Sequence, residues 1–135
     1  MKAILQVDPA DAVPLWRQIE EGMRRMVATG GLRAGALAPS VRDLARDLAV
    51  NPNTVVKAYQ RLVEAGVLVV RRGEGTYVAE TPPAFRAAER TSILRVGATR
   101  YASVALTAGA DLDEAGAVLA QAWKKLHTTQ SGGKA

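Results

Sequence analysis

The fold of this chain is decided by one stretch, which reads PSVRDLARDLAVNPNTVVKAYQRLVEAG at residues 39–66. Ser40 is followed three residues later by an acid, the spacing of a capping box, so a helix is predicted to begin at Ser40. The helix is short and ends at a tight turn over residues 49–51. Its apolar residues recur at steps of three and four, which predicts a buried face made of Val41, Leu44, Ala45 and Leu48.

A second helix is predicted after this turn. Asn51 and Pro52 are an N-cap residue and a proline at the first helical position, and Gly66 ends the helix. The inward face is predicted to consist of Val55, Ala58, Tyr59, Leu62 and Val63. The outward face carries Asn53, Thr54, Lys57, Gln60 and Arg61. Two short helices joined by a turn, the second of them polar on its outer face, are typical of a helix-turn-helix.

The segments on either side complete a small domain. Residues 14–29 place apolar side chains on one helical face, with Pro14 in the first turn and a glycine pair after the last. After the second helix, residues 67–71 are apolar and β-branched, residues 73–75 form a turn cluster, and residues 76–79 alternate again. This pattern predicts a β-hairpin directly after the helix-turn-helix, in the position that is called a wing.

Two prolines at residues 82 and 83 end this domain, which spans residues 8–80, and a C-terminal arm follows at residues 84–127. Residues 128–135 are predicted to be a disordered tail. The chain is therefore predicted to be mostly α with a small β-hairpin, in which an N-terminal winged helix-turn-helix domain precedes a short two-helix arm.

The arm is predicted to hold one helix over residues 85–107 and a second from Leu112 to about Leu126, which Asp111 caps. Two helices of this length are expected to bury one face against each other and to leave other apolar residues for a second copy of the chain to cover. The residues predicted to form this homodimer contact are Ile93, Val96, Leu106, Val118, Leu119, Trp123 and Leu126.

The amino-acid composition favours some classes of function and argues against others. Lysine and arginine number 18 against 13 for aspartate and glutamate, a net charge of +5, which favours a polyanionic partner such as nucleic acid. There is no cysteine and one histidine, His127, so we expect no disulfide, no metal site and no cofactor. The longest uncharged stretch, near residues 102–110, is far shorter than the roughly 20 residues of a membrane helix. We therefore expect a cytoplasmic protein with no membrane partner.

Two other classes of function are alternatives to DNA binding. We do not expect an enzyme, because the sequence contains no paired-acid, Ser-His-Asp, P-loop or dinucleotide-binding motif. Trp16, Tyr59 and Trp123 lie on apolar helical stripes and are predicted to be core or interface residues rather than a ligand cage. The second alternative is a winged helix that acts through protein contacts or coats DNA without preference for a sequence.

Several short motifs lie at fixed spacing in this domain: Pro39-Ser40-Val41-Arg42, Val50-Asn51-Pro52-Asn53-Thr54-Val55, Ala58-Tyr59, Gly73-x-Gly75-Thr76-Tyr77-Val78 and, in the opening helix, Pro14-Leu15-Trp16 with Gln18-Ile19. On these motifs, residues 32–78 closely resemble the winged helix-turn-helix domain of the GntR family of bacterial transcriptional regulators. Ala34 and Ala38 stand where the family usually has proline and leucine. The tail of about 55 residues after Glu80 resembles the YtrA subfamily, in which it serves dimerisation.

This resemblance implies a homodimeric repressor that binds a pseudo-palindromic DNA operator, with the second helix in the major groove and the wing at the minor groove. Asn53 and Thr54 lie in the first turn of that helix, where side chains reach base edges. Asn51 is either a similar contact or only the helix cap. Ser40 and Arg42 begin the preceding helix, and Arg42 matches the family's DNA-contacting arginine. Control by a small-molecule effector is left open.

The remaining candidate DNA contacts are basic residues and the tip of the wing. Arg46, Lys57 and Arg61 are candidates for phosphate contacts, with solubilising surface charge as the alternative. Arg72 and Gly73 match the family's wing residues, since glycine permits close backbone approach and the minor groove attracts arginine. An exposed hairpin tip without a DNA contact is the alternative for this pair.

Overall fold

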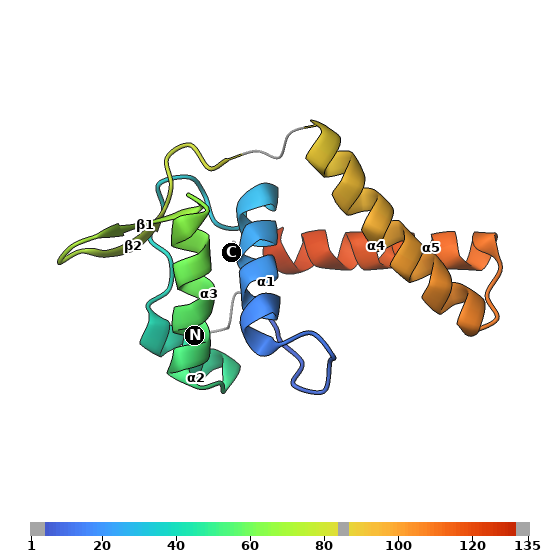
Figure 1. Cartoon of the computed structure of the whole chain (residues 1–135), viewed down its shortest axis with the longest axis horizontal. Helices are drawn as coiled ribbons and strands as arrows, with labels where there is room; N and C mark the ends of the chain where they lie inside the picture. Colours follow the sequence, from blue (N-terminus) through green and yellow to red (C-terminus); the bar gives the residue numbers. More distant parts are fainter. Residues whose placement is uncertain (1–4, 84–86, 132–135) are drawn as a thin grey trace. The chain divides into compact units, whose positions relative to one another are not determined.

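The computed structural model of the chain describes residues 5–83 and 87–131, with side chains up to residue 127. Of these, residues 5–83 with 130–131 form one compact unit and residues 87–129 form a second. The predicted fold class, mostly helical with one small β-hairpin, is confirmed (Figure 1). The first unit holds α1 (Leu15–Thr29), α2 (Val41–Leu48), α3 (Pro52–Glu64), β1 (Leu68–Arg71) and β2 (Gly75–Val78). The second unit holds α4 (Ala87–Thr107) and, up to residue 129, α5 (Leu112–Ser131).

Three helices begin where the sequence places a capping residue. The Ser40 hydroxyl accepts a hydrogen bond from the backbone N–H of Asp43 at 3.1 Å, and the Asn51 side chain accepts one from the N–H of Asn53 at 2.8 Å. Asp111 accepts one from the N–H of Glu114 at 2.8 Å. Each cap satisfies an N–H group that the first turn of a helix leaves without a backbone partner, which fixes the start of α2, α3 and α5.

The core of the first unit surrounds α3, against which α1, α2 and β1 pack. The predicted inward residues of α2 and α3 are buried or half-buried, with the exception of Val63, which is 37% exposed. The prediction for Val63 is wrong because this residue lies at the edge of the apolar face of α3, on the side of the hairpin. The largest fully buried side chains are those of Ile19, Met23, Leu44, Val55, Leu62, Leu68 and Val78.

The wing is a hairpin in which Leu68 pairs with Val78 and Arg71 pairs with Gly75. In the segment between α1 and α2, residues 36–38 pair with the other edge of β2. The N–H of Ala38 donates to the carbonyl of Thr76, and the N–H of Val78 donates to the carbonyl of Ala36, each at 2.8 Å. This added strand-like segment anchors the base of the wing to the start of the helix-turn-helix.

A buried tyrosine ties α3 to the start of α2. The Tyr59 hydroxyl, on a side chain that is almost fully buried, donates a hydrogen bond to the carbonyl of Pro39 at 2.7 Å. Burial raises the pKa of Tyr59, so its hydroxyl stays protonated and remains a donor. Because Pro39 directly precedes the cap of α2, this bond holds the two helices of the helix-turn-helix in register with each other.

Replacing Tyr59 by phenylalanine is expected to lower the free energy of unfolding by about 1 kcal/mol, because the Pro39 carbonyl loses its donor. Urea denaturation followed by circular dichroism measures this loss. The matched control is Tyr77→Phe on the wing, which removes the same group from a half-buried residue and should cost less than about 0.5 kcal/mol. Equal losses for the two variants would contradict the role of the Tyr59 hydroxyl.

The two helices of the second unit cross rather than pack along their length (Figure 1). They meet at Tyr101, whose hydroxyl donates to the carbonyl of Ala115 at 2.7 Å, and Ala105 is the one buried residue among the described side chains of this unit. The expectation that the helices bury one face against each other is therefore wrong. Gly109 and its neighbours turn the chain so that α5 leaves α4 at an angle.

The end of α5 also differs from the prediction. The helix continues to Ser131, so residues 128–131, predicted to belong to a disordered tail, are helical. No strong helix breaker stands before the glycine pair at residues 132 and 133, which explains the longer helix. Residues 84–86 and 132–135, which include the predicted start of the first arm helix and the rest of the tail, lie outside the described residues.

Candidate nucleic-acid interface

The outer face of α3 is a polar stripe opposite the core. Asn53, Lys57 and Gln60 are exposed on this face, while Thr54 is half-buried beside it. The side-chain oxygen of Asn51 caps the helix, and its contact with DNA stays a prediction. Amide groups and an ammonium group at the start of an exposed helix are the donors and acceptors that base edges and phosphates require.

Gln60 was not among the predicted DNA contacts. It lines a shallow groove between α3 and the hairpin, together with Val56, Val63 and Val70. The signal that could have found Gln60 is helical spacing, since it lies on the same face as Asn53 and Lys57. Val56 is half-buried in the wall of this groove.

The start of α2 supplies a second group of polar side chains. Ser40 and Arg42 are exposed, and Arg42 makes no ion pair within residues 5–83 and 87–127. Arg46 lies one turn further along and is paired, with its guanidinium 3.1 Å from Asp43 and 3.8 Å from Asp47. Arg42 is therefore available to a ligand as the structure stands, whereas Arg46 has to exchange its acidic partners for a phosphate.

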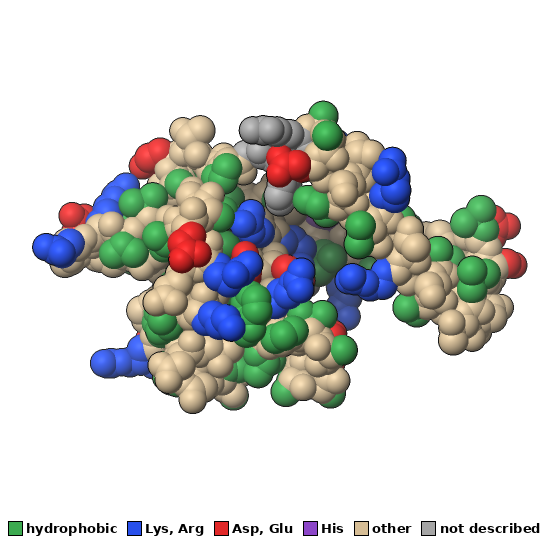
Figure 2. Space-filling model, in the orientation of Figure 1, with side chains coloured by type: hydrophobic (Ala, Val, Ile, Leu, Met, Phe, Trp, Pro, Cys, Tyr) green, Lys and Arg blue, Asp and Glu red, His purple; other side chains and the backbone are tan. Residues whose placement is uncertain are grey.

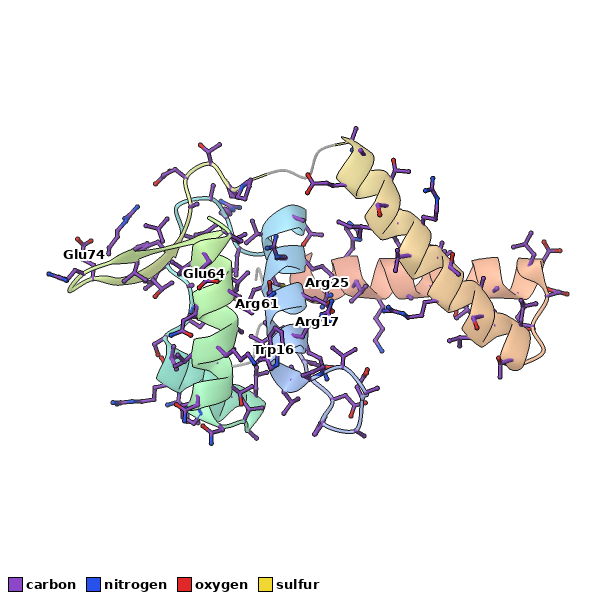
Figure 3. All side chains as sticks on the ribbon, viewed as in Figure 1. Trp16, Arg17, Arg25, Arg61, Glu64 and Glu74 are labelled. Atoms are coloured by element: carbon purple, nitrogen blue, oxygen red, sulfur yellow. The ribbon has the colours of Figure 1, made fainter. Side chains whose placement is uncertain are left out.

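The tip of the wing carries Arg72 and Gly73, both exposed, with Glu74 beside them (Figure 3). Gly73 adopts a left-handed conformation with φ of 79°, and a Cβ atom there would meet no atom within 4 Å. Arg71 is held back along the hairpin, because its guanidinium lies 4.2 Å from the Tyr77 ring centre and 3.5 Å from Glu80. The cation that the tip presents to solvent is therefore that of Arg72.

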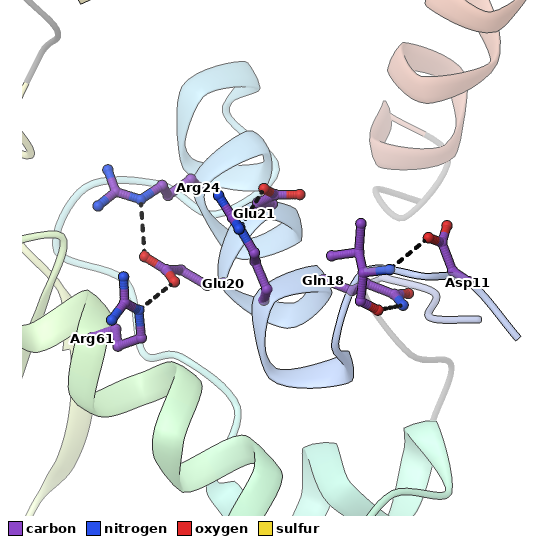
Figure 4. Close-up of polar contacts among 8 residues, drawn as sticks. Asp11, Gln18, Glu20, Glu21, Arg24 and Arg61 are labelled. Atoms are coloured by element: carbon purple, nitrogen blue, oxygen red, sulfur yellow. Dashed lines mark hydrogen bonds and ion pairs between the residues drawn. The ribbon is translucent and has the colours of Figure 1, made fainter. Parts of the chain in front are cut away.

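A basic face lies where α1 meets α3, and Figure 2 shows lysine and arginine side chains gathered over these two helices. The Lys57 ammonium lies 4.4 Å from the centre of the Trp16 ring, and the Arg61 guanidinium lies 4.9 Å from it. The Nε of Arg61 also donates to Glu20 at 2.8 Å, and Arg24 lies 3.8 Å from the same carboxylate (Figure 4). Neither the role of Glu20 nor the cationic partners of Trp16 could be predicted from the sequence, because these contacts join different helices.

The predicted DNA contacts thus fall at three places in the first unit: the start of α2, the outer face of α3, and the tip of the hairpin that projects beyond α3 (Figure 1). The structure does not gather them into an enclosed cleft. Among the described residues no group of three or more acidic or histidine side chains could hold a metal ion. This layout offers a long, open surface rather than a pocket for a small molecule.

The apolar residues predicted to form a homodimer contact are all open to solvent in the single chain. Their exposed fractions lie between 45% for Leu126 and 76% for Leu106. Trp123 stacks on His127, with the ring centres 5.4 Å apart, yet 64% of Trp123 remains exposed.

In the described part of the chain, no helix combines the length and the apolar character needed to cross a membrane.

A known protein family matches this chain within the first unit. The model for bacterial regulatory proteins of the gntR family matches residues 15–78. The HTH-type transcriptional repressor YtrA of Bacillus subtilis is 40% identical over 77 residues, which cover 57% of this chain and 59% of the repressor. The chain thus spans somewhat less than two thirds of the length of this curated relative.

Solved structures agree with this match. YtrA from Sulfolobus acidocaldarius, a GntR-family transcription factor, is 35% identical with a TM-score of 0.57, and the match covers 71% of this chain and 99% of that one. The DNA-binding domain of AraR, solved in complex with operator ORX1, has a TM-score of 0.53 and 24% identity over 58% of this chain and all of that one. This second likeness shows a shared fold.

Proposed function

This chain belongs to the GntR family of bacterial regulatory proteins, and on that premise we propose that it is a transcriptional repressor that binds a pseudo-palindromic DNA operator as a homodimer. The observation that carries the proposal is the polar, exposed outer face of α3, in a domain that also exposes Arg42, which has no ion pair among the described side chains, and a projecting wing. These are the three elements with which a winged helix-turn-helix binds a duplex. As a DNA-binding regulator, the protein acts in the cytoplasm.

Sequence readout falls to the residues at the starts of α2 and α3. Asn53 and Thr54 enter the major groove, and Arg42 reaches the edge of a guanine, the base that arginine contacts most often. Lys57 binds a phosphate, and Ser40, Arg46 and Asn51 add contacts at the rim of the groove. Arg72 and Gly73 extend the contact to the minor groove, where a glycine allows the backbone to approach the duplex closely.

The repressor role is supported by the relatives. YtrA of Bacillus subtilis is named a transcriptional repressor, and the fold shared with AraR is one that AraR uses to bind operator DNA. Selection of binding sites from random duplex DNA tests the proposal directly. An enriched, two-fold symmetric sequence supports it, while binding without enrichment supports the alternative of non-specific coating. Absence of DNA binding would leave protein contacts as the function.

Homodimerisation through the arm is supported by the apolar side chains that α4 and α5 leave exposed. Exposed apolar surface of this extent mostly marks a protein contact. A second copy of the chain is the partner that a two-fold operator requires, because each copy presents one recognition helix to one half-site. The half-site centres are then expected about 34 to 36 Å apart.

Two substitutions on α3 separate base readout from phosphate contact. Asn53→Ala is expected to cost about 1 to 3 kcal/mol on the selected site and to relax preference at one base pair. Lys57→Ala is expected to weaken operator and random duplex alike and to reduce the salt slope by about one. Fluorescence anisotropy over a series of salt concentrations measures both effects. Equal losses on selected and random DNA for Asn53→Ala would rule out its role in readout.

The wing is tested by Gly73→Val, which places a branched side chain where the backbone is to approach the minor groove. Operator affinity is expected to fall at least about tenfold, the equivalent of about 1.4 kcal/mol. Because φ is 79° at Gly73, the variant also strains the backbone, and Gly30→Val, at a φ of 84° after α1, is the matched control. If both variants bind the operator equally well, the wing tip lies outside the interface.

A further inference from the structure

Glu20 on α1 has a poorly exposed carboxylate, and this carboxylate binds the guanidinium of Arg61 on α3. The side chain of Glu20 is 12% exposed, and its Oε1 accepts a hydrogen bond from the Nε of Arg61 at 2.8 Å (Figure 4). Arg24 is the second basic neighbour of this carboxylate, at 3.8 Å, and is itself only 31% exposed. Arg61 is the half-exposed member of the cluster, so it is the cation that could otherwise turn toward a ligand.

Trp16 makes a second interaction with the Arg61 guanidinium, a cation–π contact. The Arg61 guanidinium lies over the Trp16 ring, between α3 and α1 (Figure 3). Ring stacking and a charge-assisted hydrogen bond together fix both the plane and the direction of the guanidinium. The Lys57 ammonium also lies over the Trp16 ring, but it makes no ion pair within the described residues. Its N–H groups can therefore donate to solvent or to a phosphate.

The pairing of Arg61 differs from that of Arg46 on α2. Arg46 pairs with Asp43 between side chains that are 65% and 55% exposed, where water and salt screen the attraction strongly. The Glu20 carboxylate is shielded from water, so its bond to Arg61 is screened less. If Arg61 turned to a phosphate, Glu20 would keep only the more distant Arg24, at 3.8 Å, as a cationic partner beside the DNA backbone.

We propose that Glu20 is a positioning residue that withholds Arg61 from DNA, and that it thereby sets how many phosphates the protein neutralises. This inference rests on the proposed DNA-binding function. Phosphate neutralisation is independent of base sequence, so Glu20 limits the electrostatic part of binding on operator and random duplex alike. Lys57 contributes one released counterion to the salt dependence, and Arg61 contributes none while Glu20 holds it.

The experiment compares Glu20→Gln with Glu21→Gln in the full chain. Glu21 is the next residue of α1 and also pairs with an arginine, since its carboxylate lies 3.4 Å from Arg17, between side chains that are 58% and 61% exposed. Both variants change the net charge by the same amount on the same helix, so any general charge effect is common to them. Binding to a random-sequence duplex is measured by anisotropy over a series of salt concentrations, with folding checked by circular dichroism.

Glu20→Gln is expected to steepen the slope of log affinity against log salt by about 0.9 relative to Glu21→Gln, and to bind about fivefold tighter at about 0.15 M salt. The double variant Glu20→Gln with Arg61→Gln is expected to lose this gain, because Arg61 supplies the additional contact. Identical slopes for Glu20→Gln and Glu21→Gln would overturn the proposal.

A second comparison leaves Glu20 in place and serves even if Glu20→Gln does not fold. Arg61→Gln is expected to leave the salt slope of the otherwise unchanged protein as it is, whereas Lys57→Gln reduces it by about one. A slope reduced by Arg61→Gln as much as by Lys57→Gln would show that Arg61 already binds phosphate. Failure of the proposed function has a different outcome, in which the unchanged protein selects no sequence or does not bind duplex DNA.

Discussion

Replacing Leu119 by aspartate is expected to convert a dimer of this chain into a monomer and to weaken operator binding by about a hundredfold or more. Leu119 lies on the apolar face of α5 and is 52% exposed in the single chain, so the substitution leaves the fold of one copy intact. In a covered contact between two copies, the new carboxylate loses its water without gaining a partner. A monomer then binds one half-site without the high effective concentration that a linked second half-site provides.

Sedimentation equilibrium at micromolar concentration measures the change in mass, and anisotropy on the selected operator measures the change in affinity. Ala117→Asp is the matched control, because it adds the same charge on the opposite side of the same helix. It is expected to leave both the mass and the affinity unchanged. A dimeric Leu119→Asp, a chain ending at residue 83 that remains a dimer, or a monomeric unchanged protein would each refute dimerisation through the arm.

Leu62→Ala is expected to lower the free energy of unfolding by about 2 to 5 kcal/mol. Leu62 is fully buried on the inward face of α3, at the centre of the core that α1, α2 and β1 complete. Truncation removes apolar burial and leaves a cavity that a close-packed interior refills only in part. Since a domain of this size is stable by about 5 to 15 kcal/mol, the variant loses a large share of its stability.

Urea denaturation measures this loss, and Val63→Ala on the next residue of α3 is its control. Val63 is 37% exposed, so its truncation is expected to cost less than about 1 kcal/mol. Losses of similar size for the two variants would mean that α3 does not bury the face that the structure assigns to it. The comparison also tests the one inward residue of α3 for which periodicity made a wrong prediction.

Much of the site could be predicted because its elements depend on neighbours in the chain. Ser40, Asn51 and Asp111 cap helices through bonds to residues two or three positions away. The wing turn follows from Gly73 and Gly75, which both have positive φ. Such features rest on short-range hydrogen bonds and backbone conformation, so a reading of the sequence can locate them.

The spacing of apolar residues was less informative where one face of a helix is covered only in part by other elements. It placed Val63 inside with Leu62, although the groove beside the hairpin leaves Val63 partly open. It also predicted that the arm helices bury a common face, although they cross and touch near Tyr101. Helical spacing tells which residues share a side of a helix, but not which other element covers that side.

The sequence by itself determined the order of the helices, their capped starts, the buried face of α3 and the hairpin that follows it, because each of these arises within a few residues of chain. Only the tertiary structure decided that residues 36–38 extend the wing, and that Arg61 binds Glu20, a residue 41 positions away. Such a pairing depends on how α1 and α3 pack against each other, and the spacing of residues along the chain carries no direct record of that packing.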